Sequence, residues 1–445
     1  NEVAATGKES KASAKCLDTP RRPNPLWKYV GLGENFRPRL PSRNWIIFLS
    51  IVGSFTASVI YDKREKKRNQ KKWCKLVEHI AKEPLDSRTM PRKLTIFLEA
   101  PPMDGLRSAQ DHFKEYVKPI LVSSGLDWEF IQGRKEGDIR ASVADRIRTL
   151  RQPADPLKET DHVAEFRKKN GTKYFDGPGG DLVIGRHAWK EYVRGLHEGW
   201  LGPLSGEPGI DPRKTLEQKD ISSNTTPETT AENTISQDST SPESEPKATE
   251  KSSRYPFYIS TDSYSKSSLP PEIPTELEPS IPISFPHILG FLNTPKRVYR
   301  FLNRRYLAES IGRDTAAIIL SNYRPYHDSV EHHLSNTLSD NPGFQSENTV
   351  EPAPLVAEQQ AILENEEIDW HKSVWASSDE EFERIWANPI ILDPRVASRM
   401  RKFELSIQDQ NRAKSIEVPE EEIEGWVKGS IRDFWRAGKA YLEKS

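Results

Sequence analysis

The chain has 445 residues, of which 35% are hydrophobic and 29% are charged, and it contains 34 prolines. This composition leaves too little apolar material to place every residue in a core, so we expect long segments without stable packing. The formal net charge is −1, which gives no global attraction to nucleic acid or to acidic substrates, and no nucleic-acid partner is expected.

The cysteine content is low, with only Cys16 and Cys74, and these lie on opposite sides of the apolar segment described next. They cannot pair if that segment spans a bilayer, and the chain has no CxxC spacing. The sequence therefore excludes a disulfide framework and a cysteine-based zinc site, and we expect no metal and no cofactor. The chain opens with Asn1 rather than Met, as expected of a processed or truncated protein.

A basic N-terminal segment, residues 1–43, precedes an apolar one. Asn44–Tyr61 reads NWIIFLSIVGSFTASVIY and holds no charge over 18 residues. At ~1.5 Å per residue such a helix reaches roughly 27 Å, close to a thin hydrocarbon core. Trp45 and Tyr61 stand at its ends, where aromatic rings favour the interface. We predict a membrane-spanning helix rather than a buried core helix, because both flanks are basic, and Gly53 and Ala57 give it a small face for another helix.

A basic collar follows the span, within a predicted helical extension over residues 62–82. Its first basic residues are Lys63, Arg64, Lys66, Lys67 and Arg68. The collar has three interpretations: binding of anionic headgroups such as cardiolipin, pairing with an acidic partner, and an ordinary interfacial charge cluster.

The charges beside the span bear on its orientation. Asn24–Arg43 holds four Lys/Arg and Asp62–Ile80 holds eight, so this count places the C-terminal side inside. Against it, the first 43 residues carry nine basic and four acidic residues, and an energised membrane can draw such a segment across. The charges alone leave both orientations open.

Residues 83–203 show the pattern of an α/β domain. The predicted elements are a strand at Lys93–Glu99, a helix at Leu106–Ser124, a strand at Trp128–Ile131 and a helix at Ile139–Leu150. A glycine-rich loop, a strand and a helix follow within Tyr174–Pro203. Strands and helices that alternate at this spacing predict a parallel sheet.

The rest of the chain is less regular. Residues 204–254 are rich in Ser, Thr, Pro and Glu and predict a disordered linker. Residues 255–321 continue the soluble domain, residues 322–354 form a loop, and residues 355–445 form a C-terminal helical region. The predicted elements here are helices at Lys296–Ile311, Ala357–Trp386 and Glu420–Lys444 and a strand at Ala316–Ser321. The fold class is thus a single-pass transmembrane helix plus a parallel α/β domain, with additional C-terminal helices and long disordered segments.

Two motifs contain residue types that could bind a phosphate group or a metal ion. Gly177–Asp181 reads GPGGD, which matches neither the P-loop nor the GxGxxG pattern, and Pro178 removes a backbone donor. A structural turn is favoured over phosphate binding there. His327, Glu331, His332 and His333 have side chains that bind divalent metals, but no local pattern supports a helix that would gather them, and a solvated loop is favoured.

Six stretches stand in the order in which they occur in a known family. They are NPLWKYVGL (Asn24–Leu32), LPSRNWIIFL (Leu40–Leu49), YDKREKK (Tyr61–Lys67), KKWC (Lys71–Cys74), MPRKLTIFLEAPPMDGLRSAQDHFKEYVKPIL (Met90–Leu121) and GRKEGDIRA (Gly133–Ala141). In these stretches the chain resembles the fifty-four-kilodalton subunit of the mitochondrial inner-membrane carrier translocase, in its fungal form. The resemblance is clearest from Asn24 to about Arg151 and thins toward the C-terminus.

This resemblance implies a non-enzymatic scaffold subunit of the machinery that inserts multi-spanning carrier proteins. The implied partners are the pore-forming and other subunits, the small chaperones of the intermembrane space, and carrier precursors. It also implies an N-terminus in the matrix and a C-terminal domain in the intermembrane space, opposite to the local charge count. Two alternatives stay open: a membrane-anchored α/β enzyme of the lipid- or nucleotide-kinase type, and a tether that binds lipid through the basic collar alone.

Overall fold

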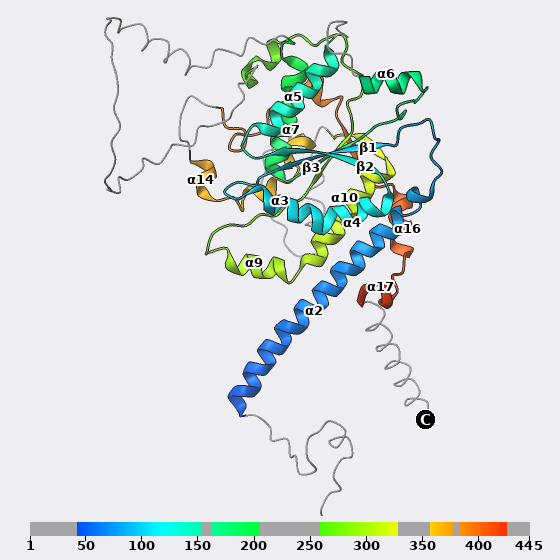
Figure 1. Cartoon of the computed structure of the whole chain (residues 1–445). Helices are drawn as coiled ribbons and strands as arrows, with labels where there is room; N and C mark the ends of the chain where they lie inside the picture. Colours follow the sequence, from blue (N-terminus) through cyan, green and yellow to red (C-terminus); the bar gives the residue numbers. More distant parts are fainter. Residues whose placement is uncertain (1–41, 153–161, 205–258, 328–356, 377–382, 425–445) are drawn as a thin grey trace, which may run out of the picture. The chain divides into compact units, whose positions relative to one another are not determined.

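The computed structural model describes residues 42–152, 162–204, 259–327, 357–376 and 383–424 (Figure 1). It divides into two units, Asn1–Ser58 and Val59–Ser445, which are described separately. The predicted disordered linker lies outside the described residues except for Leu204, and so do most of the predicted loop 322–354 and most of the last predicted helix.

One long helix, α2, runs over Arg43–Val77 and contains the whole predicted span and most of the predicted extension. A short 3₁₀ turn, η1 (Ile80–Lys82), follows it. The helix runs without a break from the predicted span through the collar and ends at Val77, before the end of the predicted extension.

Within the described residues of the second unit, six strands form one sheet in the order β2-β1-β3-β4-β6-β5. The strands are β1 (Lys93–Glu99), β2 (Asp127–Gly133), β3 (Asp181–Ile184), β4 (Ser280–Ile283), β5 (Tyr323–Pro325) and β6 (Arg401–Phe403). β1 pairs in parallel with β2 and β3, β3 with β4, and β4 with β6, whereas β5 runs antiparallel at the edge. The predicted parallel α/β sheet is confirmed.

Helices cover both faces of this sheet (Figure 1). α5 (Asp138–Arg151) and α7 (Arg186–Leu201) lie on one face, with Phe97 and Val183 of the strands packed against them. The other face carries α10 (Arg304–Leu320) and a continuous helical segment formed by α3 (Leu106–His112), the π-helical turn η2 (Phe113–Val117) and α4 (Lys118–Ser124). Side chains of each strand alternate between the two cores, as a period of two requires.

The remaining elements are short. They are α6 (His162–Lys169), η4 (Thr261–Lys266), α9 (Thr294–Phe301), α12 (Glu358–Ala361), α13 (Glu364–Glu367), α14 (Lys372–Trp375), α15 (Pro394–Ala397), α16 (Ile407–Ser415) and α17 (Glu420–Glu424). The predicted helix over Ala357–Trp386 is wrong, because its described residues form three separate turns. The predicted strand Ala316–Ser321 is also wrong: this apolar run is the last turn of α10, with Ser321 as its C-cap.

Candidate functional site: the anchored helix and the closed sheet edge

The first half of α2 presents its apolar side chains outward. None of its apolar stretch is buried, and it is the one described helix long and apolar enough to cross a membrane. This exposure separates it from a core helix of the same composition. Trp45 is 59% exposed, and a Cβ added at Gly53 would meet no atom within 4 Å. Within this unit, no other described part of the chain covers the small face at Gly53 and Ala57.

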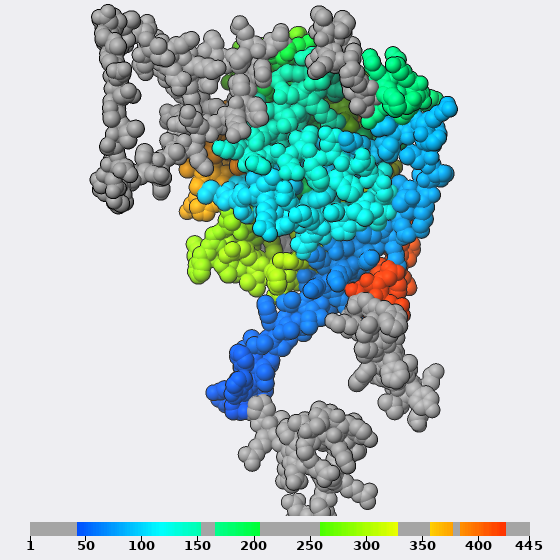
Figure 2. Space-filling model, viewed as in Figure 1, coloured from blue at the N-terminus to red at the C-terminus, as the bar shows by residue number. Residues whose placement is uncertain are grey.

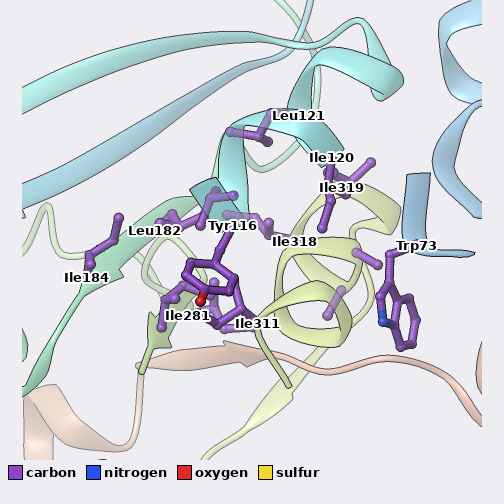
Figure 3. Packing of buried hydrophobic residues seen from close by; sticks show 14 of the residues in the cluster. Trp73, Tyr116, Ile120, Leu121, Leu182, Ile184, Ile281, Ile311, Ile318 and Ile319 are labelled. Atoms are coloured by element: carbon purple, nitrogen blue, oxygen red, sulfur yellow. The ribbon is translucent and has the colours of Figure 1, made fainter. Parts of the chain in front are cut away.

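The last turns of α2 belong to the core of the second unit. Trp73, Leu76 and Val77 are buried and join the cluster on the α10 face of the sheet. Figure 3 shows Trp73 on one side of α10 and Ile311 on the side toward the strands. Gly312 permits this contact, because a Cβ there would collide with the Trp73 indole. The sequence did not reveal this arrangement, in which a membrane-anchored helix ends inside the folded domain.

Asp62, which follows the predicted span directly, is 3% exposed. Its carboxylate accepts hydrogen bonds from the backbone N–H groups of Arg304 (3.2 Å) and Arg305 (3.1 Å). These are free donors at the first turn of α10, so Asp62 caps that helix from a position far away in the chain. The Arg305 guanidinium lies 5.4 Å from the ring centre of Tyr61, which adds a second contact between α2 and the start of α10.

Three of the five predicted collar residues pair with acidic groups of the same chain. Lys66 pairs with Glu115 of η2, and Arg64 and Arg68 both contact Glu420 of α17. Further along α2, Lys72 pairs with Glu309 and Lys75 with Glu422. Much of the collar thus fastens α2 to the domain, which sequence spacing could not reveal because the partners are distant in the chain.

Lys63 and Lys67 of the collar differ from the other three. Both are exposed, they lie four residues apart on one face of α2, and neither forms an ion pair with a residue in the described ranges. Lys71 continues the same exposed row. A role of the collar in binding headgroups or a partner therefore stays a prediction, carried by this row.

The carboxyl ends of parallel strands form the edge where α/β domains usually bind ligands, often as phosphate at a helix N-terminus. Here the N-terminus of α5 holds a buried carboxylate of the chain itself. Glu191 of α7 accepts hydrogen bonds from the backbone N–H groups of Ile139 (3.0 Å) and Arg140 (3.1 Å) and from the Trp386 indole (2.9 Å). Burial raises the pKa of Glu191 to about 7, although its interactions with Glu99 and with the backbone of Gly137 and Arg140 lower it.

The N-terminus of α7 is closed in the same way. Glu366 of α13 accepts hydrogen bonds from the backbone N–H groups of Arg186 (3.0 Å) and Phe285 (2.6 Å). Burial raises the pKa of Glu366 to about 7. The helix N-termini that follow β2 and β3 are thus occupied by carboxylates of the chain itself.

Glu99, the last residue of β1, lies fully buried at this edge. Burial raises the pKa of Glu99 well above its usual range, and the neighbouring Glu191 raises it further. Ionising two neighbouring buried carboxyl groups is unfavourable, and this favours the protonated form of Glu99.

The glycine-rich loop Gly177–Asp181 lies at the opposite edge, because it precedes β3. Glu278 accepts a hydrogen bond from the Gly180 N–H at 3.1 Å, so a carboxylate already occupies the backbone donor of this turn. Arg92 donates to the carbonyl groups of Pro178 and Gly179, both at 3.0 Å. These hydrogen bonds hold the loop to Arg92, just before β1, and to Glu278, just before β4.

A cleft of about 950 Å³ lies between α10 and the β4–β6 side of the sheet. Ile281 and Phe403 contribute apolar surface to it, and Arg324 and Glu358 line it with charge. Arg324 binds both carboxylate oxygens of Glu358, at 2.8 and 3.0 Å. Although burial alone would raise the pKa of Glu358, hydrogen bonds led by that of Arg324 hold it at about 2. The charged groups of the cleft are thus fixed in internal pairs.

The predicted metal-binding alternative falls largely outside the described residues, which include His327 but not Glu331, His332 or His333. Across the ranges that the structure does describe, no group of three or more His, Cys, Asp or Glu side chains is arranged to hold a metal ion.

These features define a class: a membrane-anchored α/β protein whose anchoring helix ends in the core and whose usual ligand edge is closed by its own carboxylates. The family model "Inner membrane protein import complex subunit Tim54" matches residues 24–403. Curated relatives named mitochondrial import inner membrane translocase subunit tim54 are 45% identical in Neurospora crassa, over 95% of this chain and 90% of the relative, and 45% identical in Aspergillus fumigatus, over 88% and 93%. The Saccharomyces cerevisiae relative TIM54 is 25% identical over 90% and 98%.

The chain therefore belongs to the Tim54 family of inner-membrane protein import complex subunits, which confirms the resemblance drawn from the sequence. It is a mitochondrial inner-membrane protein with one candidate membrane-spanning helix, α2.

Proposed function

We propose that the chain is a non-enzymatic scaffold subunit of the translocase that inserts multi-spanning carrier proteins into the inner membrane. In this role it supports assembly of the complex around the pore-forming subunit and offers docking surface to small chaperones that deliver carrier precursors. The import role follows from the family. The carrier class and the chaperones come from the resemblance, and they are part of the proposal.

One observation carries the scaffold role: α2 continues without a break from the exposed apolar stretch into the buried core at Trp73 and Val77. The cap from Asp62 and the ion pairs of Lys66 and Lys72 add contacts along the same helix. The core of the domain thus includes the last turns of the helix that carries the apolar stretch, and such an arrangement suits a structural subunit.

The alternative of an α/β kinase finds little support in the described residues. The N-termini of α5 and α7, which follow β2 and β3 at the carboxyl edge of the sheet, already hold the buried carboxylates Glu191 and Glu366. Phosphate would have to displace these groups and would meet their negative charge. The glycine-rich loop stands at the wrong edge for a phosphate loop.

We further propose that the face of Gly53 and Ala57 packs against the pore-forming subunit, with Trp45 and Tyr61 at the two interfaces of the membrane. Small side chains let two helices approach closely in lipid. Gly53 has free space around it, so this face is available to a partner.

The proposed orientation places the N-terminus in the matrix and the domain in the intermembrane space. The eight basic residues that follow the span favour the reverse orientation by count. In the folded protein Arg64, Lys66, Arg68, Lys72 and Lys75 are paired with carboxylates of the same chain. The proposed orientation follows the resemblance rather than the count.

Purification of the tagged full-length chain from mitochondria in mild detergent tests the proposal. The pore-forming subunit and the small chaperones should co-purify. The double variant Gly53→Leu with Ala57→Leu should insert normally but recover less pore-forming subunit. Val52→Leu, on another face of the same helix, should recover the normal amount. A chain that purifies alone and binds nucleotide saturably would support the enzyme instead.

A further inference from the structure

The most exposed large apolar side chains in the described ranges are two neighbours, Phe291 and Leu292. They are 87% and 91% exposed, and they stand just before α9. Tyr299 of α9 and Tyr306 at the start of α10 are 68% and 64% exposed, and both line the cleft of about 950 Å³. A folded protein seldom leaves such a cluster to water without a partner for it.

The basic side of α9 faces the domain, and its apolar side faces away from it. At 100° per residue, Pro295, Val298 and Tyr299 share one side of the helix, and Lys296 and Arg300 share the other. The basic side faces the domain, because Lys296 and Arg300 both pair with Asp369, which is 4% exposed. No residue of α9 is buried, and Val298 remains 44% exposed. A helix that packs on a soluble core has the opposite polarity.

The charge around this surface has one sign. From Phe285 to Ala308 the chain carries no Asp or Glu, and its basic residues are Lys296, Arg297, Arg300, Arg304 and Arg305. Exposed aromatic and aliphatic groups beside basic residues are typical of elements that lie in the headgroup region of a membrane with anionic lipids.

The contacts of α10 show that this surface lies close to the residues at which the apolar stretch of α2 ends. Arg304 and Arg305, three and four residues after α9, bind Asp62, and Arg305 also covers Tyr61. Tyr61 and Asp62 stand where the apolar stretch of α2 ends, so in the membrane they lie at the headgroups. All of these residues belong to the unit Val59–Ser445. Figure 1 shows α9 on the α10 side of the sheet, and Figure 2 shows it as an uncovered yellow-green surface.

We propose that α9 and the loop before it form a second membrane contact, in which Phe291, Leu292 and Tyr299 insert into the lipid interface and the exposed Arg297 meets anionic headgroups. The domain then rests on the bilayer at two points, α2 and α9, and cannot rotate freely about its anchor. This contact does not depend on which complex the chain joins.

The test uses the full-length chain in lipid nanodiscs, with Cys16→Ser and Cys74→Ser as background. Leu292→Cys carries an environment-sensitive fluorophore, and Tyr299→Cys provides a second, independent position. Leu150→Cys is the matched control, because Leu150 is 72% exposed at the end of α5 on the other face of the sheet. Labels at 292 and 299 should emit at shorter wavelength than the label at 150, and lipids with a quencher near the headgroup should quench only these two.

Two results would overturn the proposal. The first is water-like, unquenched emission at both 292 and 299 in nanodiscs that hold this chain alone. The second is the same exposed signal in lipid, followed by shielding only when other translocase subunits are added, which would assign the surface to a protein contact. Because all labelled side chains are exposed, unchanged thermal unfolding of each variant checks that the fold is intact.

Discussion

The indole of Trp73 fills the space in which a side chain at Gly312 would stand, and this contact joins the end of α2 to the middle of α10. Trp73 also donates a hydrogen bond from its indole nitrogen to Glu309, one turn before Gly312, at 3.1 Å. The anchor and the domain are therefore matched in shape at one glycine.

Gly312→Val should destabilise the domain, because the new side chain must displace Trp73 from a packed site. Overpacking of this kind costs about 1–3 kcal/mol. The thermal midpoint of the full-length chain in detergent should fall, with a change in tryptophan emission. Gly53→Val is the matched control, since a Cβ at Gly53 meets nothing within 4 Å. Equal midpoints for the two variants would mean that Trp73 does not sit against α10.

Asp62→Ala should loosen the corner between α2 and α10. It removes the acceptor of two backbone N–H groups at the start of α10, and loss of such a cap costs roughly 0.5–2 kcal/mol. Asp62→Asn keeps an acceptor but loses the charge that faces Arg305 at 3.4 Å, so its midpoint should fall between those of the wild type and the alanine variant. An alanine variant as stable as the wild type would argue against a cap supplied by α2.

The local part of this fold was readable from the sequence. The strand Lys93–Glu99 has the predicted bounds, and α5 differs from its prediction by one residue at each end, because alternation and helical periodicity are both strong there. The short strands β4, β5 and β6 have three or four residues each, too few for a period to emerge. The apolar run at the end of α10 has the sequence pattern of a buried strand. It forms a helix because of its packing in the folded domain, which the local sequence does not reveal.

The site was less predictable because its partners are far apart in the chain. Asp62 and Arg304 are 242 positions apart, and Arg64 and Glu420 are 356 apart. The collar was recognisable as a basic cluster, but pairing of most of it with the domain depends on tertiary structure. Glu191 resembles any glutamate of a polar helix until burial places it at the N-terminus of α5.

Glu99→Gln should change how stability depends on pH. The folded pKa of Glu99 is raised above the usual value of 4.5, so its proton stabilises the folded state at low pH, and that contribution is lost as pH rises above 4.5. Each pH unit costs up to about 1.4 kcal/mol until the group ionises. The glutamine does not titrate, so the stability of the variant should rise relative to that of the wild type over the range of pH above 4.5.

Thermal unfolding of both proteins across this pH range measures the difference. Glu129→Gln on β2 serves as the control, since its side chain is 56% exposed, and it should track the wild type. A constant difference between Glu99→Gln and the wild type at every pH would show that the folded pKa of Glu99 is not raised.

Ser50→Arg should impair membrane integration. Ser50 stands near the middle of the apolar stretch, where a charged side chain costs roughly 2.5–3.5 kcal/mol on insertion scales. Alkaline carbonate should extract a large fraction of the arginine variant and leave Ser50→Leu in the membrane pellet. Retention of both variants with the integral proteins would contradict a span at this position.

The most direct test of the proposed scaffold role is the side of the membrane on which the domain lies, because only the intermembrane-space side allows it to meet the chaperones. Mitochondria with a ruptured outer membrane and a sealed inner membrane are treated with protease, and an epitope tag after Ser445 is followed. The tag should be lost, while a tag before Asn1 should survive on a fragment that contains the span. Survival of the C-terminal tag until the inner membrane is lysed would contradict both the orientation and the chaperone-docking role.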